Sequence, residues 1–152
     1  MPHRKLEDGK ALAMRDTHLL IGRILLSAFF MFVSVNKLVH LDQIATDWTT
    51  RGLPVASLLV IAFSLAEFGF GIAVAIGFKA RVAAYVLAFF CVLTIPVYHD
   101  FWNMAGEARF THFVIVLQYL GMAGGFLMLA AIGTGRYSVD RSTIHSTVNA
   151  IN

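Results

Sequence analysis

Four long apolar runs constrain this chain more than any other feature of its sequence. They cover residues 19–39, 55–78, 82–98 and 110–132. Each is close in length to the roughly 20 residues with which an α-helix crosses a hydrocarbon core of about 30 Å. Charged residues make up only 14% of the chain, against roughly 25% in soluble domains. The sequence therefore predicts an all-α integral membrane protein whose four spans form one domain, residues 18–135.

The lysines and arginines gather on one side of the predicted membrane. Eight of the twelve lie in the polar N-terminal tail 1–17, in the turn 79–81 and in the C-terminal tail 136–152. By the positive-inside rule these segments face the cytoplasm. The spans then form an antiparallel four-helix bundle with both termini cytoplasmic, and the loops 41–54 and 99–109 face outward.

Charge and cysteine content exclude several classes of protein. A net charge of +3 would suggest nucleic acid as the partner of a soluble protein, but here the basic residues flank apolar runs, so the expected partner is the lipid bilayer. Cys91 is the single cysteine, which excludes an intrachain disulfide and a metal site built on several thiolates. Phosphate-binding glycine loops and paired-cysteine motifs are also missing, so nothing supports nucleotide hydrolysis or cysteine redox chemistry.

Three residues within the predicted spans carry a full charge at neutral pH, namely Arg23, Lys37 and Glu67. An ionised side chain at the centre of a membrane costs at least about 2.5 kcal/mol, so each one needs a partner or a function. Glu67 lies halfway along the second span, and the long side chain of Arg23 could reach toward it if the first two spans pack together. We therefore predict a buried Arg23–Glu67 pair. The sequence leaves open whether this pair only fixes the register of the bundle or whether Glu67 carries protons at a catalytic site.

Polar residues on the first span share one face of the predicted helix. They recur at intervals of three and four residues, the spacing of neighbours on a helix surface. The members of this face are Arg23, Ser27, Phe30, Ser34 and Lys37. Because such a face cannot contact lipid, we expect it to point into the bundle.

A second group of polar and aromatic residues lies at the outward ends of the spans. The members that we predict to bind a cofactor are His99, Trp102, Lys37 and His112. Such groups at one depth could hold a quinone headgroup, a redox partner or a metal ion. In the alternative interpretation Trp102 is an ordinary aromatic of the membrane interface and each histidine a wetted interfacial residue. The spacing of the histidines matches no compact metal-ligand motif, so we predict no metal site.

Five short segments occur in a characteristic order along the chain. They are an Arg23-bearing span that ends in Asn36-Lys37-Leu38, then Leu65-Ala66-Glu67-Phe68-Gly69, Gly77-Phe78-Lys79-Ala80-Arg81, His99-Asp100-Phe101-Trp102 and Gly135-Arg136-Tyr137-Ser138-Val139-Asp140. With these segments the chain resembles the DoxX family of bacterial inner-membrane proteins over residues 18–140. It departs from the family pattern at 110–113, where the family usually has a lysine and an asparagine.

The resemblance implies a four-helix protein of the bacterial inner membrane. Some family members are described as membrane subunits of oxidoreductases, including thiosulfate:quinone oxidoreductase, and others as parts of a thiol-stress complex. This implies a redox partner protein and quinone as the electron acceptor. In such a system we expect the Glu67 and Arg23 pair to stabilise charge or move a proton, and His99 with Trp102 to contact the quinone headgroup. The sequence shows no electron carrier of its own, so whether the chain is itself an enzyme stays open. The alternatives are a non-enzymatic scaffold or assembly factor and a small permeation protein that opens as a homo-oligomer.

Overall fold

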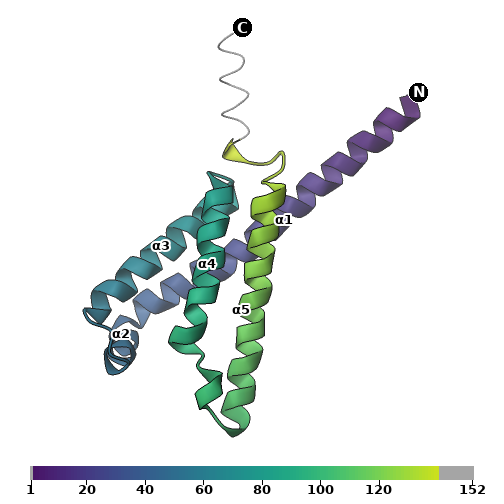
Figure 1. Ribbon diagram of the computed structural model, residues 1–152. Coiled ribbons are helices and arrows are strands. Elements are labelled where there is room, and N and C mark those ends of the chain that lie inside the picture. Colours follow the sequence, from purple (N-terminus) through teal and green to yellow (C-terminus); the bar gives the residue numbers. More distant parts are fainter. Residues whose placement is uncertain (1, 141–152) are drawn as a thin grey trace.

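Four membrane-length helices form the body of the protein in the computed structural model (Figure 1). The structure describes the backbone of residues 2–140, and it describes the side chains of residue 7 and of residues 9–140. These helices are α1 (Pro2–Val39), α3 (Ala56–Ile76), α4 (Ala80–Tyr98) and α5 (Gly106–Ile132). A short helix α2 (Leu41–Thr50) follows α1, and a 3-10 turn η1 (Phe101–Asn103) follows α4. Within the described residues four segments are long and apolar enough to cross a membrane: Gly9–Val39, Ala56–Ile76, Ala80–Asn103 and Gly106–Ile132. The all-α, four-span prediction is confirmed.

Two segments that the sequence predicts as tail and loop are helical in the structure. The N-terminal tail 1–17 continues the first span as helix from Pro2, so α1 projects beyond the other helices (Figure 1). The predicted outer loop 41–54 contains α2. Of the predicted tail 136–152, residues 141–152 lie outside the described part of the chain. The start of α1 and the end of α5 lie at the same end of the bundle (Figure 1), and the side of the membrane that this end faces stays a prediction.

The helices pack as two pairs joined along their length. α1 makes its most extensive contact with α3, α4 packs against α5, and α3 joins the two pairs through α4. One apolar core lies between the four helices, where the rings of Phe30 and Phe126 meet edge to face at 5.5 Å. A second cluster joins Trp48 of α2 to Val60 of α3. α2 is therefore part of the packed bundle.

The polar face of α1 points into the bundle, as predicted. All five of its members are buried: Arg23, Ser27, Phe30, Ser34 and Lys37. Ser27 and Ser34 donate to the carbonyl oxygens of Arg23 and Phe30, each over 2.6 Å, so their hydroxyls are satisfied within the helix. Large apolar side chains cover the outside instead, including Leu25 and Phe32, where the hydrocarbon would contact them. The bilayer thus explains why the charged residues of this helix lie inside.

The segment after α5 folds back onto the turn between α3 and α4. Gly77 ends α3 with a φ of 77°, in the left-handed region that favours glycine. The amide of Asp140 donates to the carbonyl of Gly77 over 3.2 Å, and the carboxylate of Asp140 accepts from the amide of Lys79 over 2.9 Å. A Cβ at Gly77 would lie 2.5 Å from Cβ of Ser138. The turn therefore needs glycine for its conformation and for the close approach of this segment.

We expect Gly77→Ala to lower the free energy of unfolding by about 1–3 kcal/mol, because that is the usual cost of a strained backbone. The clash of the new Cβ with Ser138 should add to this loss. Thermal unfolding in mild detergent measures this loss. Gly69→Ala is the matched control: a Cβ there has nothing within 4 Å, and alanine favours helix over glycine. Equal stability of the two variants would contradict the docked turn.

Candidate functional site

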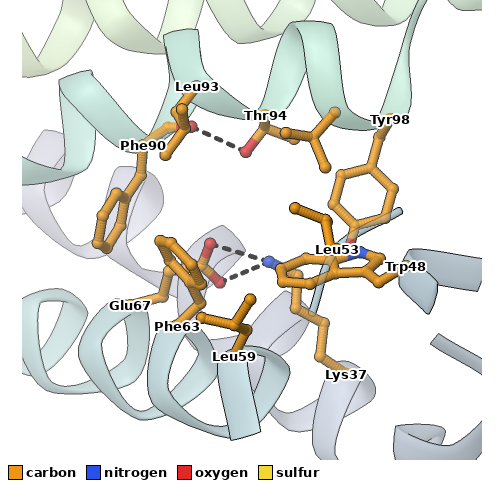
Figure 2. Close-up of a pocket in the computed structure, with 11 residues that line it drawn as sticks. Lys37, Trp48, Leu53, Leu59, Phe63, Glu67, Phe90, Leu93, Thr94 and Tyr98 are labelled. Atoms are coloured by element: carbon orange, nitrogen blue, oxygen red, sulfur yellow. Dashed lines mark hydrogen bonds and ion pairs between the residues drawn. The ribbon is translucent and has the colours of Figure 1, made fainter. Parts of the chain in front are cut away.

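A pocket of about 190 Å³ lies between α1, α2, α3 and α4 (Figure 2). Its walls are mostly aliphatic and aromatic. The lining residues are Lys37 of α1, Trp48 and Leu53 of α2 and the loop after it, Leu59, Phe63 and Glu67 of α3, and Phe90, Leu93, Thr94, Val97 and Tyr98 of α4. An apolar cavity with a few convergent polar groups is the usual form of a small-molecule site. It is the candidate functional site of this chain.

An ion pair forms the polar wall of the pocket. The ammonium of Lys37 lies 2.9 Å from both carboxylate oxygens of Glu67 (Figure 2). The two side chains are only 11% and 4% exposed, and Ser34 Oγ lies 3.4 Å from Glu67 Oε2. Each charge therefore neutralises the other in an apolar setting. An ammonium has three N–H donors, so one remains for a group in the pocket after the carboxylate has accepted two.

The predicted pair of Arg23 and Glu67 is wrong. Arg23 is 1% exposed, and its guanidinium donates to two backbone carbonyls after α5, those of Thr134 at 2.9 Å and Tyr137. The reason is geometric. Arg23 lies level with the end of α3, where a Cβ on Gly77 would be 2.7 Å from its Nη1. Glu67 lies ten residues earlier in α3, about 15 Å along the helix, beyond the reach of that side chain.

Arg23 instead fixes the segment that closes one end of the bundle. Its two carbonyl partners lie in the 133–140 segment, which also contacts α1 closely. A Cβ on Gly135, for example, would be 3.1 Å from a carboxylate oxygen of Asp16. A buried guanidinium with backbone acceptors serves as an anchor between helices. Its predicted catalytic role stays a prediction without support from this geometry.

Two interactions tie α2 over the pocket. Trp48 donates its indole N–H to the hydroxyl of Tyr98, and their rings lie 5.8 Å apart. Arg51 donates to the carbonyl of Val97 over 2.8 Å and also pairs with Asp47 at 3.1 Å. Carbonyls in the last turn of a helix lack partners within that helix, so Val97 is a ready acceptor. α2 thus covers the end of the pocket that lies nearest the end of α4.

The predicted outer cluster of His99, Trp102, Lys37 and His112 is only partly brought together. His99 and His112 meet, with their Nδ1 atoms 3.2 Å apart. Lys37 belongs to the pocket, and Trp102 is 51% exposed and packs against the neighbouring ring of Phe101 at 5.3 Å. Cofactor binding by these residues stays a prediction.

Four membrane-length helices around a buried ion pair define an integral membrane protein, and similarity to known proteins narrows that class. Residues 18–100 match the family model DoxX. The chain is 30% identical over 129 residues to inner membrane protein YphA of Escherichia coli (strain K12), which covers 85% of this chain and 92% of that protein. Inner membrane protein YqjF of the same strain is 30% identical over 128 residues, 84% of this chain and 93% of that protein. The chain belongs to the DoxX family and is a multi-pass inner-membrane protein.

A third relative is similar over a smaller share of its own length. It is the Surfeit locus protein 4 homolog of Schizosaccharomyces pombe, 30% identical over 123 residues, which are 80% of this chain and 36% of that protein. No solved structure matches the chain. The resemblance to the DoxX family that the sequence motifs indicate is therefore confirmed by the family match.

Breaking the ion pair on one side should be costly. We expect Lys37→Met or Glu67→Gln to lower the free energy of unfolding by about 3–5 kcal/mol, because Lys37→Met leaves a buried charge unpaired and Glu67→Gln leaves the ammonium without its counter-charge. The double variant should be more stable than either single one. Reversible unfolding in mixed micelles measures all three, with Asp47→Asn as control, since its exposed pair with Arg51 is worth about 1 kcal/mol or less. Strictly additive losses would contradict the pairing.

Arg23 and Glu67 should act independently. We expect the losses of stability in Arg23→Gln and Glu67→Gln to add within about 0.5 kcal/mol, since the two residues have separate partners. Arg23→Gln alone should speed hydrogen exchange at the amide of Asp140, which depends on the docked segment. A coupling energy well above 1 kcal/mol would restore the pair that the sequence suggested.

Proposed function

We propose that this chain is the membrane subunit of an oxidoreductase system and that its pocket binds the ring of a membrane-soluble quinone. The observation that carries the proposal is the ammonium of Lys37, held by Glu67 at the wall of an otherwise apolar pocket. A cavity of about 150 Å³ is known to hold a benzene ring. The 190 Å³ here suits one ring-sized headgroup.

The polar groups of the pocket fit a ring that bears carbonyl oxygens. The third N–H of Lys37 can donate to one such oxygen. The hydroxyl of Tyr98 accepts from Trp48, which leaves its own O–H for a second acceptor. Thr94, by contrast, donates to the carbonyl of Phe90 over 2.8 Å. Two donors in an otherwise apolar pocket match the two carbonyl oxygens of a quinone ring.

The position of the pocket suits a ligand that arrives from the bilayer. Leu59 and Phe63 of α3 and Leu93 and Val97 of α4 are only half-buried, so the pocket reaches the surface between these two helices. In a membrane that surface meets acyl chains. The tail of a lipid-soluble ligand could remain in the bilayer while its ring lies beside Lys37.

A bound quinone would supply the capacity to accept two electrons and two protons. The chain itself would hold the ring, exclude water and keep a proton on Nζ of Lys37, with Glu67 as the counter-charge. The electrons would come from a redox partner protein, as the resemblance to oxidoreductase subunits of the family implies.

A scaffold or assembly factor is the second candidate. The observation in its favour is that Lys37 and Glu67 neutralise each other's charge, so that the pair could act only by holding α1 against α3. In that case no ligand is needed, and replacement of both residues together would leave the function of the protein unchanged.

Quinone binding can be followed through the pocket's own tryptophan. Trp102→Phe leaves Trp48 as the single tryptophan, since the chain has two. We expect a short-tailed ubiquinone to quench its fluorescence saturably in lipid nanodiscs, and the double variant Lys37→Met/Glu67→Gln to bind at least about tenfold more weakly, because the donor at the pocket wall is lost.

Asp47→Asn, whose side chain lies outside the pocket, is the matched control and should bind like the parent. Circular dichroism establishes that each variant is folded. Equal quenching in the parent and in the double variant, or quenching that only rises linearly with quinone in the lipid, would remove the proposal and favour the scaffold.

A further inference from the structure

Two imidazoles from different helices face each other near the α4–α5 connection. His99 directly follows the last residue of α4 as its C-cap, where its amide donates to the carbonyl of Ile95 over 2.8 Å, and His112 lies in the second turn of α5. Their Nδ1 atoms are 3.2 Å apart, and their rings meet at 5.2 Å with planes 62° apart. Both residues are half-buried. The backbone of two helix ends therefore fixes this pair.

From this geometry we propose that His99 and His112 bind a divalent transition-metal ion through their Nδ1 atoms. A neutral imidazole carries one N–H and one nitrogen lone pair, and the lone pair is the metal ligand. Two nitrogens at 2.0–2.1 Å from a tetrahedral ion lie about 3.3 Å from each other. The observed 3.2 Å needs only a small adjustment to reach that separation.

Neighbouring aromatic rings hold the pair in orientation. The ring of Tyr119 lies 5.5 Å from that of His99 at a tilt of 36°, and the ring of Tyr98, the preceding residue, lies 6.4 Å from it at a tilt of 43°. Tyr98 also lines the pocket, so this one residue contacts both the ring of His99 and the pocket. The site is nevertheless separate from the Lys37–Glu67 pair and does not depend on the proposed function.

Within residues 2–140, the protein ligands of this site are His99 and His112. In the described part of the chain, no group of three or more histidine, cysteine, aspartate and glutamate residues is placed to hold a metal. The remaining positions would be filled by water or by an oxygen ligand from outside, which makes the site open and exchangeable. Imidazole ligands favour copper, nickel and zinc, and by the general order of affinities Cu²⁺ binds most tightly.

The test uses the full chain, free of any histidine tag, in lipid nanodiscs. We expect titration with Cu²⁺ to load one ion per chain, with nitrogen hyperfine structure in the electron paramagnetic resonance spectrum from two imidazoles. His99→Asn and His112→Asn should each weaken Cu²⁺ binding roughly tenfold or more. Loss of a residue that only hydrogen-bonds to a metal ligand already weakens metal binding about tenfold, and loss of the ligand itself should cost more. His40→Asn is the control: His40 is exposed, and its ring bonds to the carbonyl of Asn36 at 3.0 Å.

A second measurement needs no variant. Zn²⁺ should protect His99 and His112 of the parent chain, but not His40, from acylation by diethyl pyrocarbonate, as read by mass spectrometry of each histidine. The proposal is overturned if Cu²⁺ affinity is the same in His99→Asn, His112→Asn and the parent. The proposal is also overturned if no stoichiometric binding is found and Zn²⁺ leaves the acylation of all three histidines unchanged. The two rings would then share only a hydrogen bond.

Discussion

The ion pair between Lys37 and Glu67 is the interaction on which the rest of the structure depends. Two charges in a low-dielectric interior are tolerated when they neutralise each other, and each is very costly alone. The pair joins α1 to α3, the two helices with the most extensive contact, and thereby sets their register. It also forms the polar wall of the pocket. One constraint therefore links folding in the bilayer to the candidate site.

The spans and the inward polar face follow from sequence, because bilayer thickness sets the length of a span and the helix period sets which residues share a face. The partner of Glu67 does not follow from these rules. Side chains on a helix point toward its N-terminus. Lys37, at the far end of α1, therefore points back toward mid-membrane, whereas Arg23 points away from it. Both cations lie on the predicted face, and this direction, together with the level of Glu67 along α3, decides between them.

The pocket could not be predicted from the sequence, because the spacing of residues within single spans does not show how α2 packs on the other helices. Trp48 lies in a segment predicted as loop, although Leu41, Ile44, Ala45 and Trp48 already follow the i, i+3, i+4, i+7 pattern of an amphipathic helix. That signal could have revealed α2. The contact of Trp48 with Tyr98, fifty residues later, depends on how α2 folds over α4. The predicted outer cluster of His99, Trp102, Lys37 and His112 is only partly brought together for the same reason. Residues at one depth in the membrane need not lie side by side.

Membership of the DoxX family and the four-span fold are established by the match over residues 18–100 and by the helices, while the chemistry rests on the ion pair. The most direct test of that pair is solid-state nuclear magnetic resonance of the protein in lipid bilayers, with ¹⁵N in lysine and arginine side chains and ¹³C in glutamate carboxyls. A strong dipolar coupling between Nζ of Lys37 and the carboxyl of Glu67, as the 2.9 Å contacts require, is the expected result. Coupling of that carboxyl to an arginine nitrogen, or to no side-chain nitrogen at all, would contradict the account.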